Sequence, residues 1–139
     1  MILTDKARDD FNDWYWNVWF EDKERDAYQS KEEALYALNY ADVVFMNAIL
    51  IEWFDSVGIY ISTDYVVIDD STLAFMYSIV KYLEKGKGRK KDSWDFIERI
   101  ESFDGYSTDY YADRKEAIKQ AIIKANEIYN ETTTKRNGI

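Results

Sequence analysis

The sequence contains no cysteine and no histidine among its 139 residues. Without cysteine there can be no disulfides, thiolate nucleophiles or zinc-thiolate sites. Histidine is the side chain whose pKa lies closest to neutrality and the commonest metal ligand, so most general-base, triad and zinc mechanisms would need substitutes. We therefore expect a non-enzymatic protein with no catalytic residues, no metal and no cofactor.

Proline, flexible linkers and long apolar runs are also missing. Apolar runs such as AILI at 48–51 are too short to cross a bilayer, and the N-terminus lacks the basic flank and apolar stretch of a secretory signal. No proline and no Gly/Ser-rich linker interrupts the chain. These absences predict a soluble cytoplasmic protein with a single compact domain over 1–131 and a frayed polar tail over 132–139.

Acidic residues dominate the charge. The net charge is -9 at pH 7, which disfavours binding to nucleic acid or to an anionic membrane. Residues 1–33 hold ten acids and five bases, and residues 92–116 hold eight acids and three bases, so each segment carries -5. These segments are solvated faces, or a surface that imitates a nucleic-acid backbone and occupies a basic groove of a host enzyme.

Two helices are expected before residue 58. Thr4 is a suitable N-cap, because acids crowd the first turns that follow it, and the first helix is expected over 5–21. Ser30 and Glu33 form the S-x-x-E capping box that marks a second helix start. This helix is expected to run to Gly58, and its apolar character from 43 to 54 predicts a buried central helix.

A small sheet and a last helix are expected to follow. The run IYISTDYVVI at 59–68 predicts a hairpin turning at 62–64. Residues 71–103 fit strands joined at GKGRKK, or a helix through their 3.6-residue period. Asp113 and Glu116 form a second capping box, which opens a C-terminal helix. The fold class is therefore α+β, with a small antiparallel sheet over about 59–103; it is all-α if 71–103 is helical.

Two passages, IEWFDSVGIYI at 51–61 and YYADRKEAIKQAIIKANEIYNE at 110–131, carry a family resemblance. They resemble short proteins of phages and prophages of gut and environmental Bacteroidetes, which end in a similar R-x-E-A…K-A-N-E-I-Y-N helix. The resemblance covers about half the chain. It implies a phage or prophage setting, an α+β arrangement and a role in the host cytosol. The family has no established activity, so no catalytic residues are carried over.

The stretch DFNDWYWNVWFED at 10–22 holds six aromatic side chains in thirteen positions. One helical face of it is expected to be core, because aromatic rings dominate burial in small domains; this face comprises Phe11, Trp14, Tyr15, Val18 and Trp19. Trp16 and Phe20 fall away from that face, and exposed apolar patches mark partner or self-association surfaces. We therefore predict a partner-binding surface made of Trp16, Phe20, Asp13 and Glu21.

Two further groups of charged residues have alternative interpretations. The basic run near Gly86 and Gly88 is a solvated loop, or a loop that contacts phosphate through Lys87, Arg89, Lys90 and Lys91. Its spacing does not match a P-loop. The acid pairs Asp69-Asp70 and Asp104…Asp109 are expected to serve as turn residues and caps rather than as ligands of a hard cation.

These observations favour a non-enzymatic binding protein that docks on an unidentified host or phage protein through its aromatic and acidic surface. An inhibitor of a host enzyme would fit this description. The alternative is a structural homo-oligomer, such as a homodimer, that buries the same rings.

Overall fold

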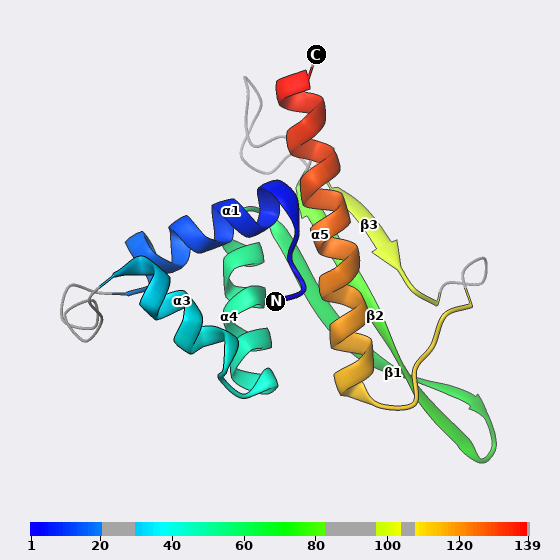
Figure 1. Ribbon diagram of the computed structural model, residues 1–139. Helices are drawn as coiled ribbons and strands as arrows, with labels where there is room; N and C mark the ends of the chain where they lie inside the picture. Colours follow the sequence, from blue (N-terminus) through cyan, green and yellow to red (C-terminus); the bar gives the residue numbers. More distant parts are fainter. Residues whose placement is uncertain (21–29, 83–96, 104–107, 139) are drawn as a thin grey trace. The chain divides into compact units, whose positions relative to one another are not determined.

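The computed structural model describes residues 1–20, 30–82, 97–103 and 108–138. Within them the chain forms four α-helices, a π-helical segment and a three-stranded antiparallel sheet, so the α+β prediction is confirmed. In chain order the elements are α1 (Asp5–Trp14), η1 (Tyr15–Trp19), α3 (Lys31–Asn39), α4 (Val43–Ser56), β1 (Ile59–Asp69), β2 (Thr72–Tyr82), β3 (Ile97–Glu101) and α5 (Arg114–Gly138) (Figure 1).

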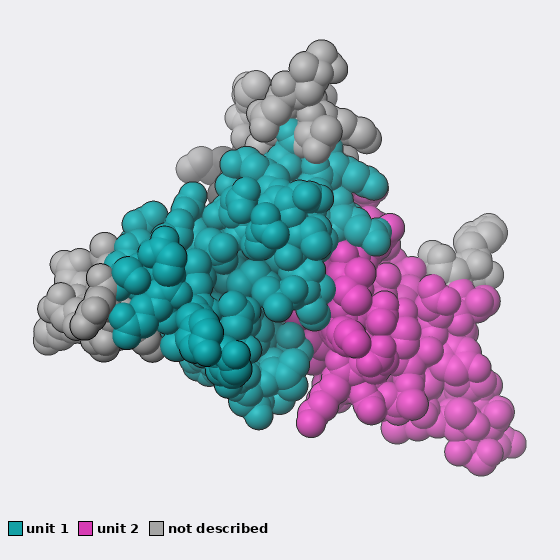
Figure 2. Space-filling view, in the orientation of Figure 1, with its two compact units in different colours: residues 1–53, 126–139 teal, residues 54–125 magenta. Residues whose placement is uncertain are grey.

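The chain forms two compact units where the sequence predicts one domain (Figure 2). Unit 1 holds residues 1–53 and 126–139, and unit 2 holds residues 54–125. The division falls inside α4, between Trp53 and Phe54, and inside α5, between Ala125 and Asn126. Unit 1 is therefore helical, and unit 2 combines the sheet with the first half of α5.

The sheet has the strand order β1-β2-β3. Its first hairpin turns between Asp69 and Thr72, so the prediction of a turn at 62–64 is wrong. Residues 59–69 form one continuous strand because they are mostly β-branched or aromatic. The turn is made by Asp69, whose Oδ1 accepts hydrogen bonds from the backbone N–H (2.9 Å) and the hydroxyl (3.1 Å) of Ser71.

Residues 72–82 and 97–101 are strands, as the β-branched and aromatic content of this stretch predicted, and the helical alternative is wrong. β2 pairs with β3 from Ser78↔Glu101 to Tyr82↔Ile97. The predicted turn at GKGRKK, with its candidate phosphate-contacting residues, lies outside the described residues.

The single helix predicted over 31–57 is divided into α3 and α4. Ser30 does cap α3, accepting a hydrogen bond from the Glu33 N–H at 3.2 Å. However, Asp42 then acts as a second cap: its Oδ1 accepts a hydrogen bond from the Val44 N–H at 2.8 Å and so starts a new helix. The helical hydrophobic period continues across this break, which is why the pattern alone concealed it.

Each unit has its own apolar core. In unit 1 the indole of Trp53 lies between two rings, with its centroid 5.8 Å from that of Phe11 and 5.0 Å from that of Tyr129. In unit 2 the sheet contributes Ile59 and Ile79, and α5 contributes Ala117, Ala121, Ile122 and Ala125. The small alanines are fully buried, so the helix has no room for larger side chains there.

α5 begins as predicted at Asp113, whose Oδ1 accepts a hydrogen bond from the Glu116 N–H at 2.8 Å. It then runs to Gly138, through the stretch for which the sequence predicts a frayed tail. The hydroxyls of Thr132 and Thr133 donate to backbone carbonyls of the preceding turn, at 2.8 Å and 2.9 Å. None of the helices in the described part of the chain has the length and apolar content that crossing a bilayer requires.

The burial of Ala121 gives a first prediction. Ala121→Leu should destabilise the protein by about 1–3 kcal/mol, because the added methylenes overpack a closed site. Urea unfolding followed by circular dichroism measures this. Ala48→Leu makes the same change at an exposed position inside α4 and should alter stability little. Equal stabilities for the two variants would contradict the close packing described for α5.

Candidate functional site

The aromatic stretch of the first helix ends in a π-helical turn. The backbone N–H of Phe20 donates to the carbonyl of Tyr15 at 3.2 Å, five residues earlier, instead of to the residue four earlier as in an α-helix. The wider turn brings Phe20 back towards Tyr15, and their ring centroids lie 4.7 Å apart. Trp19 packs edge-on against Phe20 at 5.3 Å.

This geometry changes the partner-binding surface predicted on the first helix. Phe20 is only 5% exposed, so the expectation that it lies on the surface is wrong. Its physical cause is the π turn, which the α-helical period used for the sequence does not include. Trp16 is half-buried and packs against Phe20 at 6.1 Å, Asp13 is exposed, and Glu21 lies outside the described residues.

The same turn alters the predicted core face. Phe11 and Tyr15 are buried as predicted, whereas Trp14 and Trp19 are half-buried. Val18 was predicted to be core and is 64% exposed, so that part is wrong. The apolar surface of unit 1 therefore has different members from those that the helical period indicates.

Five of the seven large apolar side chains that are exposed in the described part of unit 1 come from the end of α3 and the start of α4. We call this surface the α3–α4 patch; it consists of Tyr36, Tyr40, Val43, Val44 and Phe45, all exposed. The rings of Tyr36 and Tyr40 lie 4.8 Å apart, one helical turn from each other. Phe45 extends the patch to Trp19, edge-on at 6.3 Å. The beginning of α4 was predicted to be buried, but Val43, Val44 and Phe45 are exposed.

Tyr36 and Tyr40 also interact through their hydroxyls. The side-chain hydrogen bond to Tyr40 raises the pKa of Tyr36, with a smaller contribution from burial. Tyr36 therefore stays neutral across the physiological pH range. Both rings offer an apolar face together with a hydroxyl, a combination common at protein interfaces.

The segment that carries this patch is acidic. Residues 31–56 carry five acids and one base, Lys31. Lys31 forms an ion pair with Asp13, so the one cation of the segment is already engaged by a carboxylate. Glu52 accepts a hydrogen bond from the indole Nε1 of Trp19 at 3.3 Å. The arrangement is an apolar surface in a negative field, which complements a basic partner.

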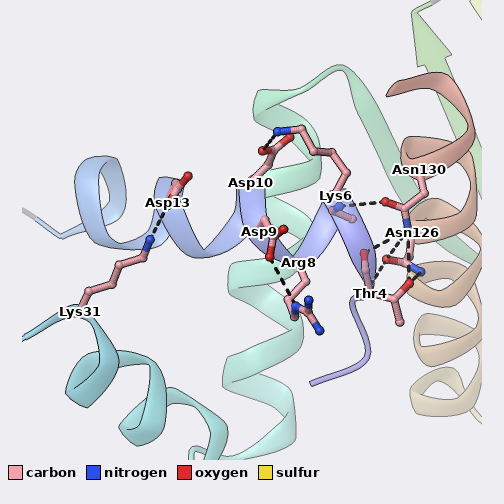
Figure 3. Close-up of polar contacts among 10 residues, drawn as sticks. Thr4, Lys6, Arg8, Asp9, Asp10, Asp13, Lys31, Asn126 and Asn130 are labelled. Carbon is pink, nitrogen blue, oxygen red and sulfur yellow. Dashed lines mark hydrogen bonds and ion pairs between the residues drawn. The ribbon is translucent and has the colours of Figure 1, made fainter. Parts of the chain in front are cut away.

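A second polar cluster joins α1 to α5 within unit 1 (Figure 3). Asn126 and Asn130, the asparagine pair, project from α5 towards Thr4. Asn126 accepts a hydrogen bond from the Thr4 N–H (2.9 Å) and donates one to the Thr4 hydroxyl (3.0 Å). Asn130 accepts from the Ala7 N–H at 2.8 Å, so it caps α1 in place of Thr4, whose side chain makes no capping bond.

Asp10 continues this cluster one turn later. Partial burial acts to raise the pKa of Asp10, but hydrogen bonds from Lys6 and Tyr129 and the charge of Lys6 outweigh it, so the pKa is lowered from its ordinary 3.8. The Lys6 ammonium lies 2.6 Å from Oδ1, and the Tyr129 hydroxyl donates to Oδ2. The cluster fixes the position of α1 and has the character of a structural network.

The remaining candidate groups lie partly in the hairpin turn and partly outside the described residues. Asp69 belongs to the hairpin turn, where hydrogen bonds, the largest from the Ser71 backbone, lower its pKa. Asp104 lies outside the described residues, as do Lys87, Arg89, Lys90 and Lys91. In the described part of the chain, no three acidic side chains converge as they would around a metal ion.

Asp10 provides a pH-dependent prediction. A carboxyl whose pKa is lowered by folding stabilises the protein fully above its unfolded pKa, and this stabilisation is lost as the pH falls through the folded pKa. Asp10→Asn should therefore be less stable than the wild type at pH 7, by roughly 1 kcal/mol. The difference should shrink as the pH falls below 3.8.

Urea unfolding at pH 7 and pH 3 measures this difference. Asp9→Asn is the matched control, because Asp9 is exposed and pairs only with Arg8 at 3.6 Å among the ion pairs of the described residues. A difference between Asp10→Asn and wild type that is the same at both pH values would show that the carboxylate charge contributes nothing.

Comparisons with models of protein families, with curated proteins and with solved structures found no match to this chain. The function proposed below therefore follows from the chain's own residues.

Proposed function

We propose that this protein is a non-enzymatic binding protein whose α3–α4 patch docks on a partner protein that presents an apolar face flanked by basic side chains. The observation that supports this most directly is the exposure of five apolar side chains around one turn, in a segment with five acids and one base. Exposed apolar patches on small domains mark interaction surfaces.

The composition of the patch favours a protein partner. Tyr36 and Tyr40 supply rigid rings with a polar tip, and Val43, Val44 and Phe45 supply aliphatic and aromatic contact. Aromatic residues surrounded by polar groups are typical of the centre of a protein interface. Nucleic acid is a poor candidate, because its phosphates would meet the acids around the patch.

The charges also favour a different protein over a second copy of this chain. Two copies meeting through the α3–α4 patch would bring Glu32, Glu33 and Asp42 of each close to those of the other. Like charges brought together at an interface oppose association. A partner with lysine or arginine around its apolar face gains instead from the same acids.

The setting that we propose is the cytosol of a bacterium, where a phage or prophage protein would act on a host or phage protein. The sequence resemblance of 51–61 and 110–131 supports the phage setting. The absence of histidine and cysteine supports a role in binding rather than catalysis. Occupation of a basic groove of a host enzyme is one form that such binding would take.

The test uses the double variant Tyr40→Ser, Val44→Ser. These side chains are 76% and 56% exposed, so their loss should leave the fold intact. The matched control is Val57→Ser, Tyr110→Ser, which removes exposed apolar surface in unit 2. Wild type and both variants are used as bait in lysate of the source organism, and captured proteins are identified by mass spectrometry at two salt concentrations.

We expect to capture one stoichiometric basic partner. The control should capture it as the wild type does, and the patch variant should capture at least tenfold less. Capture should weaken at high salt. A partner retained by both variants would refute the assignment of the patch. Capture of no partner, together with a wild-type mass in sedimentation above 16.6 kDa that the patch variant lowers, would establish self-association instead.

A further inference from the structure

The edge of the sheet formed by β1 offers a second surface, in unit 2. β1 pairs with β2 along its length, from Ile59↔Lys81 to Asp69↔Thr72, and no strand of the described chain pairs with its other side. It has eleven residues, about twice the common strand length. Long edge strands are usually protected by lysine or proline, and β1 contains neither.

The hydrogen bonds of β2 identify the backbone groups of β1 that face outwards. The N–H and C=O of Phe75 both bond to Tyr111, at 2.8 Å each, so neither is directed at β1. Tyr65 is the partner of Phe75 in the register. In an antiparallel pair such residues are not hydrogen-bonded to each other, so the N–H and C=O of Tyr65 point away from β2.

The same reasoning applies to Thr63, two residues before Tyr65 in β1. Tyr77 donates its N–H to Ser102 Oγ at 2.9 Å and accepts from the Ser102 N–H at 3.0 Å, so its backbone also faces away from β1. Its register partner is Thr63. The backbone groups of Thr63 and Tyr65 therefore both face the outer edge, at the spacing of two residues that an added strand requires.

Asp64 modifies this edge. Its Oδ1 accepts a hydrogen bond from the outward N–H of Tyr65 at 3.0 Å. The side chain is exposed, so the carbonyl of an incoming strand can take over this N–H and leave the carboxylate available for an ion pair. In the free protein the Asp64 carboxylate therefore occupies this N–H, and a lysine or arginine of an incoming strand would form an ion pair with it.

The side chains beside Asp64 are apolar and exposed. Tyr65 and Val67 are 63% and 65% exposed, and Leu73, the register partner of Val67, is exposed as well. Residues two apart on a strand share one face of the sheet, so these three side chains lie together. Figure 1 shows this turn end of the hairpin projecting past the first turn of α5.

Charge selects the occupant of the edge. β1 carries the acids Asp64 and Asp69 and no base, so pairing two copies edge to edge would gather four acids without a counter-charge. We propose that the outer edge of β1 binds an extended segment of another protein by strand addition, with a lysine or arginine opposite Asp64 and apolar side chains beside Tyr65 and Val67. This recognition is independent of the α3–α4 patch, and its backbone hydrogen bonds resemble those of other domains that bind peptides as strands.

The test uses two synthetic ten-residue peptides with blocked ends and alternating valine and threonine. One has a single central lysine and the other has glutamate in its place. Each is titrated into the ¹⁵N-labelled full chain and followed by NMR. We expect the amide signals of Thr63 and Tyr65 to shift and to exchange more slowly, and the lysine peptide to bind about fivefold more tightly, as one cross-strand charge pair provides.

Three variants sharpen the test. Asp64→Lys should reverse the preference between the peptides, while Asp109→Lys, the same charge change at another exposed position of unit 2, should leave it unchanged. Thr63→Pro removes an outward N–H and leaves the β1–β2 hydrogen bonds in place, so it should abolish binding while the spectrum of the sheet persists.

Several results would overturn the proposal. These are equal binding of both peptides, peptide-induced shifts that map away from β1, and no binding of the lysine peptide at millimolar concentration. Slower exchange of the Tyr65 amide as the concentration of the chain itself is raised would assign the edge to a second copy, which also contradicts the proposal.

Discussion

The first turn of α1 depends on two carboxamides from the other end of the chain. A helix leaves its first N–H groups without partners, and near-neighbour side chains normally satisfy them. Here Asn130 takes the Ala7 N–H, and Asn126 holds Thr4 through both its backbone and its hydroxyl. This fixes α1 against the second half of α5. The rings of Phe11, Trp53 and Tyr129 then complete the core of unit 1 beside it.

Local signals in the sequence were sufficient wherever a bond closes within a few residues. The capping bonds of Ser30 and Asp113 were predicted and are present, and so is the strand character of 72–82. The π turn was not predictable, because the prediction assumed 3.6 residues per turn throughout and a π turn holds one residue more. Phe20, predicted to lie on the partner surface, is buried, and Val18, predicted to lie in the core, is exposed.

The division of the second helix was hidden for a related reason. Hydrophobic spacing is continuous from Leu38 to Phe54, and only Asp42, read as a cap, could have indicated the break. An aspartate within an otherwise apolar stretch, followed directly by Val43 and Val44, was the local sign of a new helix start. The α3–α4 patch was missed with it, because residues 43–45 are exposed only when they form the first turn of a new helix. The asparagine pair gave no local signal, since its partners are more than 120 residues away.

The distance in sequence between Thr4 and the asparagine pair has a consequence for synthesis of the protein. During translation, the N–H groups that begin α1 emerge from the ribosome long before Asn126 and Asn130 are made. Contacts between residues so far apart form late and slowly, because the intervening chain must first be brought together. The backbone groups at the start of α1 therefore remain without these partners until the second half of α5 has been made. The rings of α1 and η1 can meet Phe45 and Trp53 earlier in synthesis, but the position of α1 is fixed only when the turn of α5 that carries the asparagine pair has been made.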